Sequence, residues 1–193
     1  MIKEDKYELI INSAIELLQT ENYQNMKTAT IAKGAGIAEG TIYRYFKNKK
    51  EIFEEVLKYA LAKLEEIAFT AITPEKNFEE NFEILKNNFL TIKEKGKKYY
   101  KIKYKAYSEM EEEEIKKIVL ENSDKERENM QNIFKWALEK KEIEVTEEKI
   151  KTIVYMLLAF SQYSMRLYTI GYPQSEIEKE LKNVIEYIKI FIK

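Results

Sequence analysis

Apolar residues recur along most of the chain with the three-to-four-residue spacing of an amphipathic helix. Near the N-terminus, Tyr7, Ile11, Ala14 and Leu18 follow this spacing, so they share one face of a helix. The same period continues through longer segments, which are separated by short stretches that contain Gly, Pro, Ser or Thr. The pattern predicts helices over residues 7–18, 27–34, 38–46, 49–72, 74–96, 97–108, 123–141, 146–168 and 175–191.

Short polar side chains indicate where several of these helices begin. A Ser or Thr before the first turn accepts a backbone N–H that has no partner inside the helix. A Glu three residues later completes a capping box. We therefore expect caps at Thr73, with Pro74 following, at Thr146, and at the pairs Ser123–Glu126 and Ser175–Glu178.

One segment fits two kinds of secondary structure. Between residues 97 and 108, Tyr100, Ile102 and Tyr104 alternate with lysines, which is the period of a strand. A lone strand would leave its backbone groups unpaired, because no other segment predicts a second strand. We therefore predict a helix here and assign the chain to the all-α class, with about nine helices and no sheet.

The composition excludes many kinds of function. The 193 residues include no Cys, no His and only two Asp, Asp5 and Asp124. The common zinc centres, cysteine nucleophiles and imidazole bases are therefore absent. An all-helical enzyme would depend on Glu, Lys or Tyr, and no spacing of these residues supports one. We predict that the protein is not an enzyme and has no catalytic residues, no metal site and no cofactor.

No segment predicts a membrane anchor. The longest apolar run covers residues 153–160, far short of the roughly 20 residues needed to cross a bilayer. The first residues are charged and lead into no signal-peptide core. The sequence therefore predicts a soluble cytoplasmic protein.

Positive charge is concentrated in one short stretch. The whole chain has 33 Lys+Arg and 34 Asp+Glu, a net charge of −1. Residues 27–50, however, contain six basic residues and one acid, Glu39. A local cationic patch on a nearly neutral protein favours contact with a polyanion at that place.

The same stretch has the pattern of a helix-turn-helix. Gly36 allows the positive φ that a tight turn between two helices requires. Ile37 is expected to fill the corner, while Ile42 and Phe46, four residues apart, hold the second helix against the core. The other faces of residues 38–46 would then be presented to a DNA major groove.

The motif resembles the signature of TetR-type transcriptional regulators. The resemblance is carried by Ile31-Ala32, Ala35-Gly36-Ile37, Gly40-Thr41-Ile42-Tyr43, Tyr45-Phe46 and Lys49, and it extends over residues 7–57. Met26 and Ala38 depart from it, because the family usually has a capping Thr and Ser there. The resemblance implies an N-terminal three-helix DNA-binding domain, residues 1–48, and a C-terminal helical domain for ligand binding and dimerisation, residues 49–193.

The resemblance also implies which residues contact DNA. The guanidinium of Arg44 suits a guanine edge or a phosphate. Packing alone is the alternative for Tyr45, simple solvation for Lys47, and capping or pairing for Glu39. The expected DNA-binding residues are Thr28, Ala38, Glu39, Gly40, Thr41, Tyr43, Arg44, Tyr45, Lys47 and Lys49.

The last two predicted helices are expected to form a dimer interface. Residues 150–168 are apolar on nearly every face, and such a helix must be buried on both sides. The final helix carries a heptad-like seam. Pairing with a twofold mate would give a four-helix interface, and closure of a monomer's core is the alternative. The expected interface residues are Ile153, Leu157, Ile177, Leu181, Val184 and Ile188.

The middle helices are expected to enclose a ligand pocket if the resemblance holds. Aromatic and Met side chains there suit an apolar or aromatic small-molecule effector, although ordinary core packing is the alternative for each. The candidates are Phe69, Phe82, Phe89, Tyr104, Tyr107, Met110, Met130, Trp136, Met156, Phe160 and Tyr163.

These observations predict a ligand-responsive regulator of transcription. It would bind a palindromic operator in double-stranded DNA as a homodimer, act as a repressor, and be released by a small molecule. The alternative is a helical interaction or sensor module that retains the fold without specific DNA binding.

Overall fold

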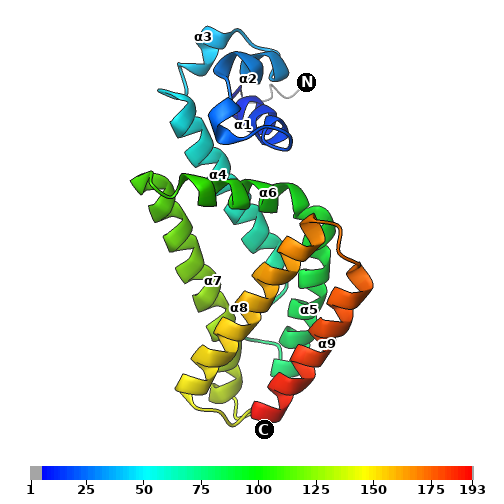
Figure 1. The fold of residues 1–193 in the computed structure, drawn as a ribbon. Helices are drawn as coiled ribbons and strands as arrows, with labels where there is room; N and C mark the ends of the chain where they lie inside the picture. Colours follow the sequence, from blue (N-terminus) through cyan, green and yellow to red (C-terminus); the bar gives the residue numbers. More distant parts are fainter. Residues whose placement is uncertain (1–5, 193) are drawn as a thin grey trace, which may run out of the picture. The chain divides into compact units, whose positions relative to one another are not determined.

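The computed structural model describes residues 6–192 and is all-α over that range (Figure 1). Nine α-helices and two 3-10 helices occur in these residues, and no strand does. None of the described helices could cross a membrane. The elements are α1 Lys6–Leu17, η1 Tyr23–Asn25, α2 Thr28–Gly34, α3 Glu39–Ile42, α4 Lys49–Phe69, α5 Phe78–Lys95, α6 Lys97–Ala106, η2 Tyr107–Glu109, α7 Glu113–Glu139, α8 Glu147–Thr169 and α9 Gln174–Phe191.

The chain forms two compact units. The first unit combines the chain up to Leu64 with Lys98–Glu121, and the second combines Glu65–Lys97 with the chain from Asn122 onward. Both α4 and α7 therefore begin in the first unit and end in the second. The predicted boundary after residue 48 divides the chain by function and stays a prediction.

The core of the first unit joins α1, α2 and α3 to the N-terminal half of α4 and to α6. Ile10 of α1, Ile31 of α2 and Ile42 of α3 are fully buried there, as is Phe53 of α4. Aromatic rings add to this core, since Tyr23 lies 4.8 Å from Phe53 between ring centroids. The short α3 is thus held by burial rather than by its own length.

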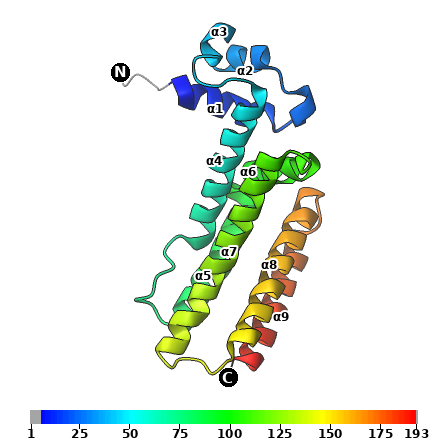
Figure 2. The same ribbon diagram turned by 90° about the vertical axis from the view of Figure 1, so that its left-hand side faces the viewer.

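The core of the second unit is built mainly from α5, α7, α8 and α9. Phe82 of α5 and Phe134 of α7 are buried in it together with Val154 of α8 and Ile188 of α9. The helices α8 and α9 lie side by side, as both views show (Figures 1 and 2).

The structure corrects two of the predicted caps in this unit. Helix α5 begins after Asn77, not after Thr73. The Asn77 side chain accepts from the Glu80 backbone, and Glu80 accepts in return from the Asn77 N–H, at 2.9 Å each. Helix α9 begins at Gln174 with Pro173 before it, so Ser175 lies inside the helix. The cap at Thr146 is confirmed by its bond from the Lys149 N–H.

Helix α7 also begins earlier than predicted. It runs without a break through Ser123, where the sequence indicated a capping box. The reason is tertiary, because Ile115 and Ile118 are buried in the core of the first unit. Burial of these two side chains keeps the residues before Ser123 helical and overrides the local capping signal.

Candidate nucleic-acid interface

The turn between α2 and α3 has the geometry that the sequence predicted. Gly36 adopts φ +66°, which a side chain at this position would disfavour. The Ile37 N–H donates to the Ala32 carbonyl at 3.0 Å, and the Gly36 N–H donates to the Lys33 carbonyl at 3.3 Å. This pair of bonds is a Schellman motif, which satisfies the free carbonyls at the end of α2.

A close contact fixes α2 against α1. The Ser13 hydroxyl of α1 donates to the Ile31 carbonyl at 2.8 Å. A Cβ atom on Gly34 would lie 2.3 Å from the Ser13 Oγ, well inside van der Waals contact. Gly34 is therefore required here by close approach rather than by its backbone angles.

The helical phase of α3 is also as predicted. Ile42 and Phe46 are buried, while Tyr43 is 55% exposed. Only Glu39–Ile42 are α-helical, and Ala38 precedes them without a side-chain cap. The chain then leaves α3 through bonds from the Tyr45 and Phe46 N–H groups to the Ile42 carbonyl. The helix is therefore shorter than the predicted range 38–46, although the same side chains face inward.

Tyr7 of α1 contacts both Phe46, which ends the α2–α3 motif, and Glu55 of α4. The Tyr7 ring stacks on Phe46 with centroids 5.4 Å apart, and the Tyr7 hydroxyl donates to Glu55 at 2.9 Å. Burial, together with Glu55, raises the pKa of Tyr7 to about 12. The pKa of Glu55 is lowered by its hydrogen bond from Lys58 and further by Tyr7.

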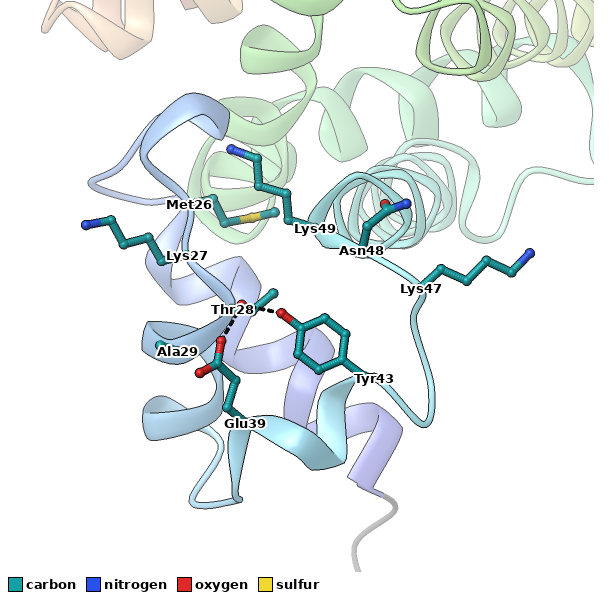
Figure 3. Close-up of a pocket in the computed structure, with 9 residues that line it drawn as sticks. All are labelled: Met26, Lys27, Thr28, Ala29, Glu39, Tyr43, Lys47, Asn48 and Lys49. Carbon is teal, nitrogen blue, oxygen red and sulfur yellow. Dashed lines mark hydrogen bonds between the residues drawn. The ribbon is translucent and has the colours of Figure 1, made fainter.

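Beside α3 lies a hollow of about 420 Å³, shown in Figure 3. The side chain of Thr28, at the start of α2, lies between those of Glu39 and Tyr43. Its Oγ1 is 2.6 Å from the Glu39 Oε1 and 3.2 Å from the Tyr43 hydroxyl. The lining consists of Met26, Lys27, Thr28, Ala29, Glu39, Tyr43, Lys47, Asn48 and Lys49.

Two lysines of the hollow differ in how they are held. The Lys49 amine donates to the carbonyls of Gln24, at 3.1 Å, and Tyr23, at 3.4 Å, and lies over the Tyr23 ring. It therefore braces η1 while it lines the hollow. In Figure 3 the Lys47 side chain extends away from the ribbon, and this residue is exposed.

The hollow brings together half of the residues predicted to contact DNA. Five of the ten line it: Thr28, Glu39, Tyr43, Lys47 and Lys49. The others lie outside its lining, where Ala38, Gly40, Arg44 and Tyr45 are exposed and Thr41 is half-buried. Whether any of them contacts DNA stays a prediction.

Sequence reasoning missed Asn48. Its side chain accepts from the Glu51 N–H at 3.0 Å, which caps the start of α4. The pattern Asn48-x-x-Glu51 is a sequence signal for such a start. It could have been found in the same way as the cap at Thr146.

Helix α6 is tied to the end of α1 within the first unit. The Lys105 amine donates to the Leu18 carbonyl at 2.7 Å, and the Lys101 amine donates to the Gln19 carbonyl at 3.3 Å. The Gln19 side chain returns a bond to the Lys98 carbonyl. Burial, followed by the charge of Lys101, lowers the pKa of Lys105. Cations at this position satisfy carbonyls that α1 leaves free.

The predicted pocket residues are divided between the two units. Tyr104, Tyr107 and Met110 fall in the first unit, and the other eight fall in the second. Among those eight, Phe82, Phe89 and Met130 are buried, Phe69, Trp136 and Phe160 are half-buried, and Met156 and Tyr163 are exposed on α8. The ligand pocket therefore stays a prediction, and a single cavity inside one unit cannot include all eleven.

Most of the residues predicted at the dimer interface are buried within the single chain. Ile153, Leu157, Ile177, Leu181 and Ile188 are all buried there, and Val184 is half-buried. Most of the seam of α9 thus packs in the core of its own unit, and whether any of the six residues contacts a second copy stays a prediction. The large apolar side chains that α8 and α9 leave exposed are Tyr155, Met156, Tyr163, Tyr187, Ile190 and Phe191.

Comparisons with known proteins by sequence match only part of the chain. The sequence profile of the family described as bacterial regulatory proteins, tetR family, matches residues 10–56. The chain is 41% identical to the fatty acid metabolism regulator protein of Bacillus subtilis over a stretch of 68 residues. This stretch covers 33% of this chain and 35% of that protein. It is 33% identical over 97 residues to the uncharacterized HTH-type transcriptional regulator YhgD of the same organism, which covers 46% and 51%. The matches thus span about a third to a half of these relatives.

The likeness to solved structures extends over nearly the whole chain. A TetR transcription regulator from Haloarcula marismortui matches with a TM-score of 0.84 at 14% identity, over 98% of this chain and 99% of that chain. At this identity the match shows the fold alone.

Proposed function

We propose that the chain, whose residues 10–56 match the tetR family of bacterial regulatory proteins, is a regulator of this family. It would repress transcription by binding double-stranded DNA through α3 and the hollow beside it. Members of this family are regulators of transcription and not enzymes. A protein with this function acts in the cytoplasm, where bacterial DNA lies.

One observation carries this proposal. Ile42 and Phe46 anchor the motif by burial, and the opposite side presents Thr28, Tyr43 and Lys47 to solvent around one hollow. Hydroxyl and ammonium groups of this kind bind phosphate oxygens, which fixes a protein on the duplex. The side chain of Arg44, also exposed, is suited to a base edge.

We further propose that the protein binds DNA as a homodimer through α8 and α9. Tyr155 and Tyr163 of α8, together with Tyr187 and Ile190 of α9, are each at least 60% exposed. Large apolar side chains that are exposed in this way are typical of a protein interface. A twofold dimer presents two copies of α3 to half-sites about one DNA turn apart, so the operator would be palindromic.

We also propose that a small apolar or aromatic molecule controls this binding from the second unit. Such a ligand can release DNA only if it binds the two states of the dimer unequally. Helix α4 joins the two units along the chain, and α6 is tied to α1 through Lys105. Both helices could carry a displacement to α3.

The direct test is DNA binding by the full chain. Duplexes selected from a random library should bind wild type in preference to an unselected duplex of equal length, by gel shift or fluorescence anisotropy. Arg44→Ala and Lys47→Ala should weaken binding, while the matched control Lys117→Ala, at an exposed lysine of α7, should not. If no duplex is preferred, the helical module without specific DNA binding becomes the better explanation.

A further inference from the structure

Glu39 is an unfavourable residue on a surface that is proposed to bind a polyanion. It is the one acid among residues 27–50, it is exposed at the first position of α3, and it lines the hollow with three lysines. A carboxylate here repels the phosphates that the lysines attract. Its presence therefore lowers affinity for DNA in general unless some part of the target compensates for it.

The hydrogen bonds around Glu39 have only one consistent direction. An ionised carboxylate can only accept, so the Thr28 hydroxyl donates its single proton to Glu39 at 2.6 Å. Thr28 can then only accept from the Tyr43 hydroxyl, which lies 3.2 Å away. In the free protein, both hydroxyl protons therefore point along the chain Tyr43 to Thr28 to Glu39 (Figure 3). Neither proton is free for a phosphate oxygen.

DNA can compensate for the carboxylate by donating a hydrogen bond from a base edge in the major groove. The N4 amino group of cytosine is the usual donor to a Glu side chain, and the N6 amino group of adenine is the other amino donor there. A cytosine amino group that bonds to Glu39 offsets the charge of the carboxylate, and the second carboxylate oxygen can still accept from Thr28. Where no amino group is present, the phosphates and Glu39 compete for the same donors.

From this juxtaposition of Glu39, Thr28 and Tyr43, we propose that Glu39 is a specificity-determining residue that selects a cytosine in each half-site. It acts by weakening binding to every duplex that does not offer an amino group there. This inference rests on the proposed function, because it requires α3 to face a major groove.

The decisive variant is Glu39→Gln, since its amide oxygen can still accept from Thr28 but carries no charge. Affinities for a selected operator and for an unrelated duplex of equal length should be measured at one salt concentration. The ratio of the two affinities should fall by roughly 5–150-fold, the usual contribution of one base contact, chiefly because binding to the unrelated duplex becomes tighter. Repeating the selection with the variant should abolish one cytosine preference in each half-site.

A matched control separates this effect from a change in net charge. Glu111→Gln alters an exposed acid outside the hollow by the same amount, and its affinity ratio should equal that of wild type. If Glu39→Gln lowers both affinities equally, or changes neither, then Glu39 only ties α3 to α2 and the inference is wrong.

A second readout needs no knowledge of the operator. In wild type the Thr28 proton is held by Glu39, so Thr28→Val should change binding to the unrelated duplex less than twofold. In the Glu39→Ala background that proton is free for phosphate, and the same change should cost several-fold in affinity. Equal effects in the two backgrounds would overturn the inference alone. Failure of wild type and all variants to bind any duplex would overturn the proposed function as well.

Discussion

The exposed side chains of α3 and those of α8 and α9 differ in chemistry. Around α3 the surface presents hydroxyl and charged groups, such as Thr28 and Lys47. On α8 and α9 it presents large apolar groups, such as Tyr155 and Ile190. Charge and hydrogen bonds suit a hydrated polyanion, whereas apolar area suits a second protein surface. This difference is consistent with the proposal that α3 binds DNA while α8 and α9 bind a second copy of the chain.

Ionic strength should separate these two surfaces most strongly. If each subunit neutralises three or four phosphates, the log–log slope of DNA affinity against salt should be roughly −5 to −7. Affinity would then fall by about a thousandfold or more between 50 and 200 mM salt. Dimerisation through α8 and α9, measured by sedimentation over the same range, should change little. A DNA slope shallower than about −2 would mean that the surface around α3 is not the DNA-binding one.

Two neighbouring residues of α3 should have opposite phenotypes. Ile42→Ala should lower the free energy of unfolding by about 2–5 kcal/mol, because it empties a fully buried position. Tyr43→Ala should leave the thermal melt nearly unchanged and weaken binding to a selected duplex. Chemical unfolding and anisotropy measure the two effects. An exchange of phenotypes would show that the phase of α3 differs from the one described.

Two neighbouring residues of α9 should distinguish core from interface. Ile190 is 67% exposed and Ile188 only 1%. Ile190→Glu should weaken dimerisation by about 10–100-fold, since it places a charge at an apolar interface, while the monomer keeps its melting temperature. Ile188→Ala should instead lower the melting temperature. If the dimer dissociation constant of Ile190→Glu equals that of wild type, the second copy binds elsewhere.

The close contact between Ser13 of α1 and Gly34 of α2 can be tested by a second substitution that restores stability lost in the first. Gly34→Ala should destabilise the protein by about 1–2 kcal/mol, because its Cβ displaces the Ser13 hydroxyl and breaks the bond to Ile31. Adding Ser13→Ala should restore much of that loss, since the conflicting oxygen is gone. Urea unfolding of both single variants and the double variant measures the coupling. A Gly34→Ala protein as stable as wild type would contradict the close approach.

The smallest effect is expected for Tyr7→Phe. Loss of its hydrogen bond to Glu55 should cost about 0.5–1.5 kcal/mol at pH 7. The pKa of Tyr7 is raised from 10.0 to about 12. Its contribution to stability is therefore present below pH 10 and lost as the pH rises toward 12. The difference in unfolding free energy between wild type and variant should accordingly shrink between pH 10 and about pH 12. A constant difference would mean that the hydroxyl does not donate to Glu55 in solution.

The sequence by itself determined the features that depend on neighbouring residues along the chain. The helical period, the turn at Gly36, the inward phase of Ile42 and Phe46, and the cap at Thr146 all follow from local sterics and hydrogen bonds. These features involve residues within a few positions of each other, so a short segment of sequence contains the necessary information.

Only the tertiary structure decided which faces are covered and which side chains meet. It begins α7 before Ser123, because Ile115 is buried in the core of the first unit. It turns the seam of α9 inward, so that Ile188 packs inside the chain and Ile190 does not. It also brings Thr28 to Glu39, eleven positions apart on different helices. Each outcome depends on the angle and distance between helices, which arise from the packing of whole side chains and not from any local pattern.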